Sequence, residues 1–92
     1  MKNLVSKVEV EIVNEWGLHA RTATLFVKES QKYSSTIEVE IGDNYIANGK
    51  DISSLLLLAA EKGSILKLTA TGLDSKEALL NLSNLIKSGF YE

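Results

Sequence analysis

The spacing of hydrophobic residues changes several times along this chain, from every second residue to every third or fourth and back again. Alternation is typical of a strand with one solvent-facing side, and the longer spacing is typical of a helix with one buried face. The predicted strands are 6–13, 36–41, 44–48 and 64–71. The predicted helices are 20–32, a segment that Asp51 caps and that ends near Gly63, and a last helix capped by Asp74 or Ser75. The order is therefore βαββαβα.

These elements predict an α+β fold, because each strand has one apolar side and each helix has one apolar stripe. Such faces can be buried together in an open-faced β-sandwich, with four antiparallel strands and three helices on one face of the sheet. The predicted core positions of the strands and longer helices are Val8, Val10, Ile12, Ala23, Phe26, Val27, Ser30, Ile37, Val39, Ile41, Ile65, Leu66, Leu68, Ala78, Leu79, Leu82, Leu85 and Ile86. One face of the second helix comprises Ile52, Leu55, Leu56 and Ala59. We expect a single domain, 1–92.

The composition excludes several classes of function. The chain has 92 residues, a formal charge of -2, no cysteine and one histidine. Disulfides and cysteine-based metal sites are therefore excluded, and one histidine is too few for an ordinary zinc site. The weakly acidic balance argues against a nucleic-acid partner. Since no signal peptide or membrane-spanning run is visible, we expect a cytoplasmic monomer without membrane insertion.

A turn at residues 14–23 joins the first predicted strand to the first predicted helix and contains the histidine. Gly17 supplies the backbone freedom that a tight turn needs. His19 follows at or next to the helix N-cap, where the first N–H groups have no helical partner and the helix dipole is positive. Arg21 adds a guanidinium suited to phosphate oxygens. This combination favours a side chain that carries a phosphoryl group, and Trp16 fits either the core or the rim of the site.

Both charged residues also have an ordinary interpretation. A lone histidine is most often a plain surface residue. Arg21 could be a solvated charge, although a cation at a helix N-terminus is unfavourable by a few tenths of a kcal/mol, up to about 1 kcal/mol. An incoming dianion would explain that placement, so the functional interpretation is preferred for His19 and Arg21.

Two blocks of this sequence carry a family resemblance. Residues 17–21 read Gly-Leu-His-Ala-Arg, and a second block covers 48–52 and 55–63. Together they resemble the histidine-containing phosphocarrier (HPr) family of the bacterial phosphoenolpyruvate-dependent sugar phosphotransferase system. The similarity extends over residues 8–89.

The resemblance implies a covalent relay. His19 would accept a phosphoryl group from phospho-enzyme I, through the ring nitrogen nearer the backbone, and pass it to a histidine of a sugar-permease component. Arg21 and the backbone N–H groups of Ala20 and Arg21 would stabilise the phosphate. The family's carriers bind no cofactor or metal and have no independent turnover, so whether such a chain counts as an enzyme is left open.

Two positions depart from the family pattern. Thr22 stands where the family usually has proline, which restores a backbone N–H and adds a hydroxyl. Asp51 stands where many relatives have a serine that a regulatory kinase phosphorylates. Aspartate is as good an N-cap as serine, so a purely structural role is one interpretation of Asp51. The other is that its fixed charge partly imitates phosphoserine.

The family docks its partner enzymes on the start of the first helix and the exposed part of the second. Carried over residue by residue, the predicted docking positions are Thr22, Leu25, Ile52, Ser53 and Leu56. An apolar patch of this kind is a normal interaction site.

Three rival functions remain open from the sequence. The same chemistry could end in a control protein, as in the nitrogen-related branch of the system. The chain could instead be an interaction module that binds a transcription factor, with His19 serving only as a cap. A ligand-binding or RNA-binding sandwich of other ancestry would need a pocket or a basic face that the sequence does not show.

Overall fold

A computed structural model of the chain describes residues 4–43 and 45–92. Its elements are β1 (Val5–Glu11), α1 (Ala20–Ser30), β2 (Thr36–Glu40), β3 (Ile46–Asn48), α2 (Ile52–Leu56), β4 (Ile65–Thr71) and α3 (Ser75–Lys87). The predicted order βαββαβα is confirmed, and most element ends differ from the predicted ones by one or two residues. Residue 44, the predicted start of the third strand, lies outside the described residues.

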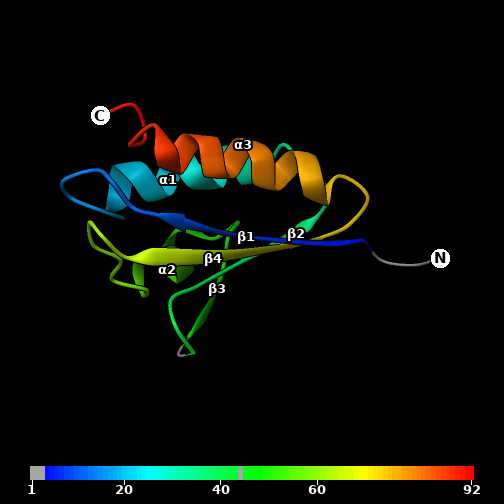
Figure 1. The fold of residues 1–92 in the computed structure, drawn as a ribbon, viewed down its shortest axis with the longest axis horizontal. Coiled ribbons are helices and arrows are strands. Elements are labelled where there is room, and N and C mark those ends of the chain that lie inside the picture. Colours follow the sequence, from blue (N-terminus) through cyan, green and yellow to red (C-terminus); the bar gives the residue numbers. More distant parts are fainter. Residues whose placement is uncertain (1–3, 44) are drawn as a thin grey trace.

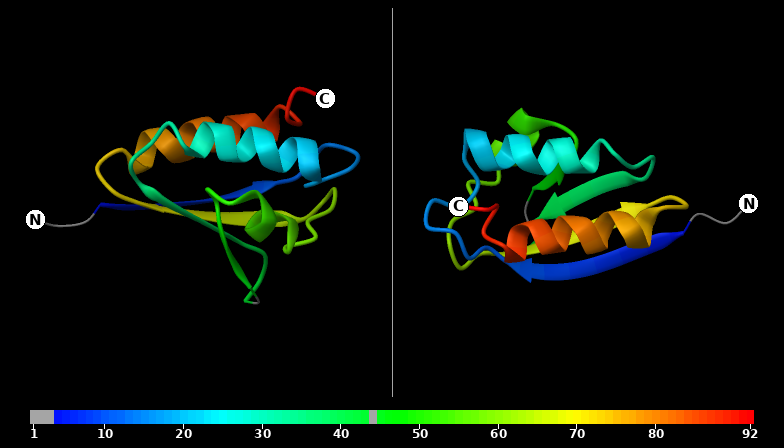
Figure 2. Two further views of the ribbon diagram at one scale, coloured as in Figure 1. Left: turned by 180° about the vertical axis from the view of Figure 1, so that it is seen from behind. Right: turned by 90° about the horizontal axis from the view of Figure 1, so that it is seen from above.

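The four strands form one antiparallel sheet in the order β1-β4-β2-β3. Leu68 of β4 pairs with Val8 on one side and Val39 on the other, which aligns the apolar positions of three strands. Helices α1 and α3 lie side by side over one face, and the other face is open (Figures 1 and 2). The short α2 packs against α1 and β3. The predicted open-faced β-sandwich is confirmed.

The core lies between the sheet and the two long helices. The predicted core positions that are buried are Val10, Ile12, Ala23, Phe26, Val27, Ser30, Ile37, Val39, Leu66, Leu68, Ala78, Leu79, Leu82, Leu85 and Ile86. Val8 and Ile41 are partly buried and pack against this cluster. The prediction that Ile65 belongs to the core is wrong, because this residue is 47% exposed. In β4 the inward positions are Leu66, Leu68 and Ala70, and alternation places Ile65 on the open face.

The second helix is shorter than its apolar run predicts. It ends with Leu57 as C-cap, and Ala59 has a positive φ of 51°. Of the predicted face only Leu55 is buried, while Ile52 and Leu56 are exposed. Tertiary hydrogen bonds explain the early end, because the segment after the helix must turn back to meet the end of β1.

Two of those bonds join this returning segment to the chain around β1. The carbonyl of Ala60 accepts from Leu18 N–H at 2.9 Å, and Gly63 N–H donates to Ile12 O at 2.8 Å. These contacts attach the turn before α1 to the segment after α2.

In the described part of the chain, no helix is long and apolar enough to cross a membrane.

Asp74 precedes α3 but does not cap it through its side chain. Its carboxylate instead accepts the N–H of Ser34 at 2.9 Å, the N–H of Ser35 at 3.0 Å and the Ser35 hydroxyl. The Ser35 hydroxyl and the Ser34 N–H lower the pKa of Asp74 from 3.8 to about 2. The carboxylate therefore fastens the loop between α1 and β2 to the start of α3.

We predict that Asp74→Asn lowers the free energy of unfolding at neutral pH. A carboxyl group with a lowered pKa in the folded state stabilises the protein fully above its unfolded pKa and loses this effect as the pH falls. The difference between wild type and variant should therefore shrink as the pH falls from about 4 to about 2. Urea unfolding across this range measures it. The exposed Asp43→Asn serves as control, and an equal pH dependence in both variants would contradict the assignment.

Candidate functional site

His19 is the N-cap of α1, as predicted, with extended backbone angles (φ −129°, ψ −174°). Its ring nitrogen Nδ1 accepts the N–H of Arg21 at 3.3 Å. Its own N–H donates to Thr22 Oγ1 at 3.0 Å, which closes a reciprocal capping pattern. The imidazole is therefore held at the point where the unpaired N–H groups and positive dipole of an 11-residue helix favour an anion.

The approach of two backbone segments explains the glycine in this turn. Gly17 has a φ of 62°, and a Cβ at this position would lie 2.3 Å from the Ala60 carbonyl oxygen. A side chain would therefore strain the backbone and push apart the contact that holds Leu18 to Ala60.

Thr22 contributes to the same turn from the inside. Its hydroxyl donates to the Gly17 carbonyl at 2.8 Å while it accepts from His19 N–H. The residue is 0% exposed. The prediction that Thr22 contacts docking partners is therefore wrong, because its side chain is used to fix the turn and does not reach the surface.

A carboxylate lies against the two predicted functional side chains. Glu92 Oε2 is 3.3 Å from His19 Nε2 and forms an ion pair with the Arg21 guanidinium. Glu92 Oε1 accepts from Asn14 Nδ2 at 2.9 Å. The His19 and Arg21 side chains are 34% and 67% exposed, so both can be reached from solvent.

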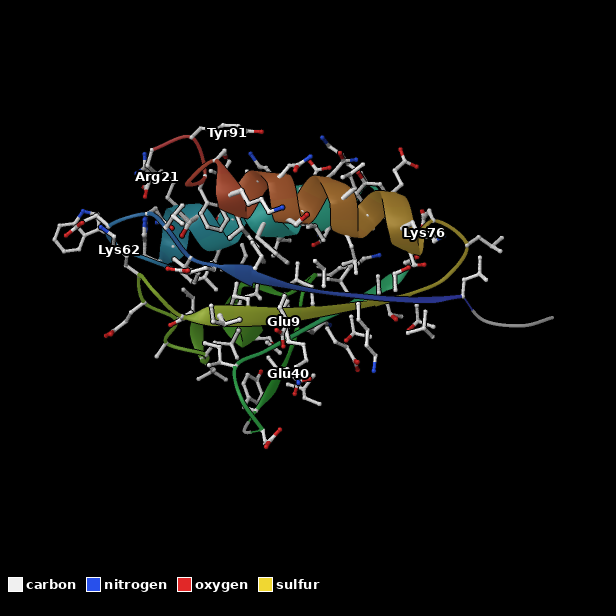
Figure 3. The ribbon with its side chains drawn as sticks, viewed as in Figure 1. Glu9, Arg21, Glu40, Lys62, Lys76 and Tyr91 are labelled. Carbon is white, nitrogen blue, oxygen red and sulfur yellow. The ribbon has the colours of Figure 1, made fainter. Side chains whose placement is uncertain are left out.

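The surroundings of these residues are open and combine polar and apolar groups. A hollow beside the site is lined by Arg21, Trp16, Lys62, Lys87 and Glu92 among others. Figure 3 shows Arg21 and Lys62 at the same end of the molecule as Tyr91. Trp16 is 77% exposed, which assigns it to the rim of the site. Within residues 4–43 and 45–92, no group of three or more His, Cys, Asp or Glu side chains could hold a metal ion.

The remaining predicted docking residues lie at or near the surface. Ile52 and Leu56 are 37% and 38% exposed, and Ser53 is also exposed. Leu25 is half-buried and packs against the core. Leu57, which sequence reasoning did not assign to this patch, is 72% exposed and extends the apolar surface of α2. We call Ile52, Ser53, Leu56 and Leu57 the α2 patch.

Asp51 is the N-cap of α2. Its carboxylate accepts the N–H of Ser54 at 3.2 Å, which confirms the capping interpretation. Imitation of a phosphoserine by this residue stays a hypothesis.

Two residues of the site were not found from the sequence. Asn14 lies within the turn that the sequence singles out, but nothing in its spacing marks it as a partner of Glu92. Glu92 is 73 positions from His19. Only the folded arrangement of α3 and the segment after it brings that carboxylate to the imidazole.

Comparisons with known proteins agree with this geometry. The family model described as "PTS HPr component phosphorylation site" matches residues 6–88. The phosphocarrier protein HPr of Neisseria meningitidis is 38% identical over 94% of this chain and 96% of its own length. The multiphosphoryl transfer protein of Escherichia coli O157:H7 is 34% identical over 96% of this chain, which corresponds to 24% of that longer protein.

Solved structures give the same result. HPr-C-His of Thermoanaerobacter tengcongensis matches with a TM-score of 0.89 and 45% identity, over 95% of this chain and 97% of that one. Together, the fold, the helix-capping histidine and these matches show that the chain belongs to the HPr family of phosphocarriers of the phosphotransferase system.

Proposed function

We propose that His19 is the phosphoryl-accepting residue of a relay from phospho-enzyme I to a sugar-permease component. The observation that carries the proposal is the position of the His19 ring, with Nδ1 directed at the N–H of Arg21 at the start of α1. Histidine suits this role because the neutral ring is a competent nucleophile near neutral pH and covalent capture divides one transfer into two.

The transfer can be followed atom by atom. The lone pair of Nδ1 attacks phosphorus, the N–P bond to His19 forms, and the bond between phosphorus and the donor breaks with its electron pair on the donor. The phosphoryl oxygens then take the place of Nδ1 as acceptors of the N–H of Arg21, with Ala20 N–H beside it. Since phosphoryl transfer depends mainly on positioning and charge stabilisation, the helix N-terminus and the Arg21 guanidinium supply what the step needs.

The carrier must also meet a donor and an acceptor in turn. We assign this contact to the α2 patch together with Leu25, because exposed apolar side chains lie there beside α1. A small interface suits a protein that must leave each partner quickly. We expect the relay to operate in the cytoplasm with the carrier as a monomer.

We predict that the chain is phosphorylated once when it is incubated with enzyme I and phosphoenolpyruvate. Mass spectrometry under alkaline conditions, which preserve phosphohistidine, should show one added phosphoryl group in wild type and none in His19→Ala. An unmodified wild-type chain beside an active donor would overturn the proposal.

Arg21→Gln should slow phosphoryl transfer to His19 by about ten- to a hundred-fold, because a charge-assisted hydrogen bond to the transferred group is lost. Arg21→Lys keeps the charge without the two-pronged guanidinium and should fall in between. Rapid-quench kinetics measure both variants. The control Lys28→Gln removes an exposed charge from the same helix and should leave the rate unchanged; equal losses in the two Gln variants would argue against a specific role for Arg21.

Replacing Ile52 and Leu56 by alanine should raise the KM for this carrier in the enzyme I reaction by roughly ten-fold and leave the kcat close to wild type. The apolar contacts that these two side chains make with enzyme I would be lost, and such contacts affect binding rather than the chemical step. Ile65→Ala is a matched control, because this isoleucine is 47% exposed on the open face of the sheet. If the Ile65 variant raises the KM as much as the double variant, docking does not occur on α2.

A further inference from the structure

The outer edge of β1 takes no part in the proposed relay. β1 is an outer strand of the sheet, and α3 lies along its helix-covered side (Figure 2). The other outer strand is β3, and α2 packs against that strand. A protein bound to β1 therefore leaves the α2 patch accessible.

Two hydrogen bonds at the ends of β1 show which backbone groups face outward. Leu4 O accepts from Gly72 N–H at 2.8 Å, and Ile12 N–H donates to Ser64 O at 2.9 Å. The N–H and C=O groups of an antiparallel strand alternate between its two edges. The even-numbered residues of β1 therefore bond to β4, and the odd-numbered residues, such as Lys7, direct these groups to the outer edge. A further strand can pair with this row of groups.

The side chains of β1 leave this edge open. Successive side chains point to opposite faces of the sheet, so those of Lys7 and Glu9 lie on the open face and not across the edge. Hollows lie on both sides of the edge: one is lined by Lys7, Val8, Glu9 and Lys67, and the other lies between β1 and α3. Charged residues often protect a sheet edge from pairing, but here they leave the plane of the strand clear.

The groove between β1 and α3 has an apolar floor and two cationic ends. One stripe of α3 lines it at the helical spacing i, i+4, i+7 and i+11: Lys76, Leu80, Ser83 and Lys87. Leu80 is 60% exposed, and Val8 lies on the strand side of the floor. Both lysines are exposed, and among the residues that the structure describes neither forms an ion pair. The described residues that line the groove include no carboxylate.

We propose that this groove binds an extended, acidic segment of a partner protein, which pairs with β1 as an added strand. Main-chain hydrogen bonds to the edge of β1 hold the segment, and the side chains on one of its sides enter the groove. Lys76 and Lys87 are three helical turns apart, roughly 16 Å. Extended residues i and i+4 lie on one side of a strand, about 13 Å apart. Two carboxylates at this spacing therefore reach both lysines, with an apolar side chain between them over Leu80.

The charges argue against a second copy of this chain as the occupant. A second β1 strand would direct Ser6, Val8 and Val10 into the groove, and none of these can neutralise the lysines. The other outer strand, β3, has only three residues and is too short to span the groove. An acidic segment supplies the missing countercharge.

NMR titration of the full, unphosphorylated chain with a defined peptide tests the proposal independently of the role of His19. The probe is acetylated and amidated Thr-Glu-Thr-Val-Thr-Glu-Thr, which places two carboxylates and the valine on one side of a strand. We expect the amide signals of Lys7, Glu9 and Leu80 to shift and those of the α2 patch to stay. The same peptide with lysine in place of glutamate should bind about ten-fold more weakly, because two attractions become repulsions.

Three outcomes would overturn the inference: no shifts along β1 at millimolar peptide, shifts centred on the α2 patch, or equal affinity for the two peptides. Sedimentation velocity of the chain alone adds a fourth. A dimer that the glutamate peptide dissociates would assign this edge to a second copy.

Surface variants test the groove without removing any buried side chain. Lys76→Gln and Leu80→Ala should each weaken binding of the glutamate peptide by about three-fold, since each loses one exposed contact. Lys28→Gln removes an exposed charge from α1, outside the groove, and should bind as wild type does. Unchanged binding in both groove variants, or a loss in Lys28→Gln as large as in Lys76→Gln, would contradict the proposed site.

Methylated peptides test the strand pairing itself. In an extended peptide the N–H groups of the central valine and of the threonine before it point to opposite edges. Only one of them faces β1, so one N-methylated peptide should bind about ten-fold more weakly than its parent and the other about equally well. Equal affinities of the two methylated peptides would show that the segment does not pair with β1.

Discussion

The functional end of this molecule depends on one close approach between two backbone segments, at Gly17 and Ala60. The pairing of β1 with β4 brings the turn after β1 next to the segment that precedes β4. The bond from Leu18 N–H to Ala60 O then fixes the turn, and the glycine makes room for the carbonyl. His19 is positioned because the residue before it is attached through this bond to the segment between α2 and β4.

In the proposed relay, the capping interactions of α1 serve the structure and the chemistry with the same atoms. Nδ1 of His19 satisfies an N–H that the start of a helix would otherwise leave unpaired. A phosphoryl group on that nitrogen would take over the same N–H, so the site needs no large rearrangement to receive it. The buried Thr22 hydroxyl forms the other half of the cap and bonds to the Gly17 carbonyl in the preceding turn.

Local sequence patterns predicted most of the fold, because the spacing of apolar residues that defines a strand or a helix involves only residues close together in the chain. The alternation of Val8, Val10 and Ile12 and the helical spacing of Ala23, Phe26 and Val27 reflect which side of each element faces the core.

The failures involve distant contacts. The length of α2 was overestimated because the hydrogen bond between Leu18 and Ala60 ends the helical run. No residue within the run indicates where that bond forms. Thr22 was assigned to the surface because the family pattern indicates the position but not the direction of its side chain. Glu92 carries no motif and becomes part of the site only when the chain is folded.

The brevity of α2 has a consequence for recognition. Five residues make little more than one helical turn, and a helix of that length does not persist on its own in water. Its shape is imposed by the Asp51 cap and by Leu55, which is 0% exposed. The shape of the surface that we propose partner enzymes contact is therefore maintained by residues beneath it. A change at Leu55, invisible from outside, would alter affinity as directly as a change in the surface itself.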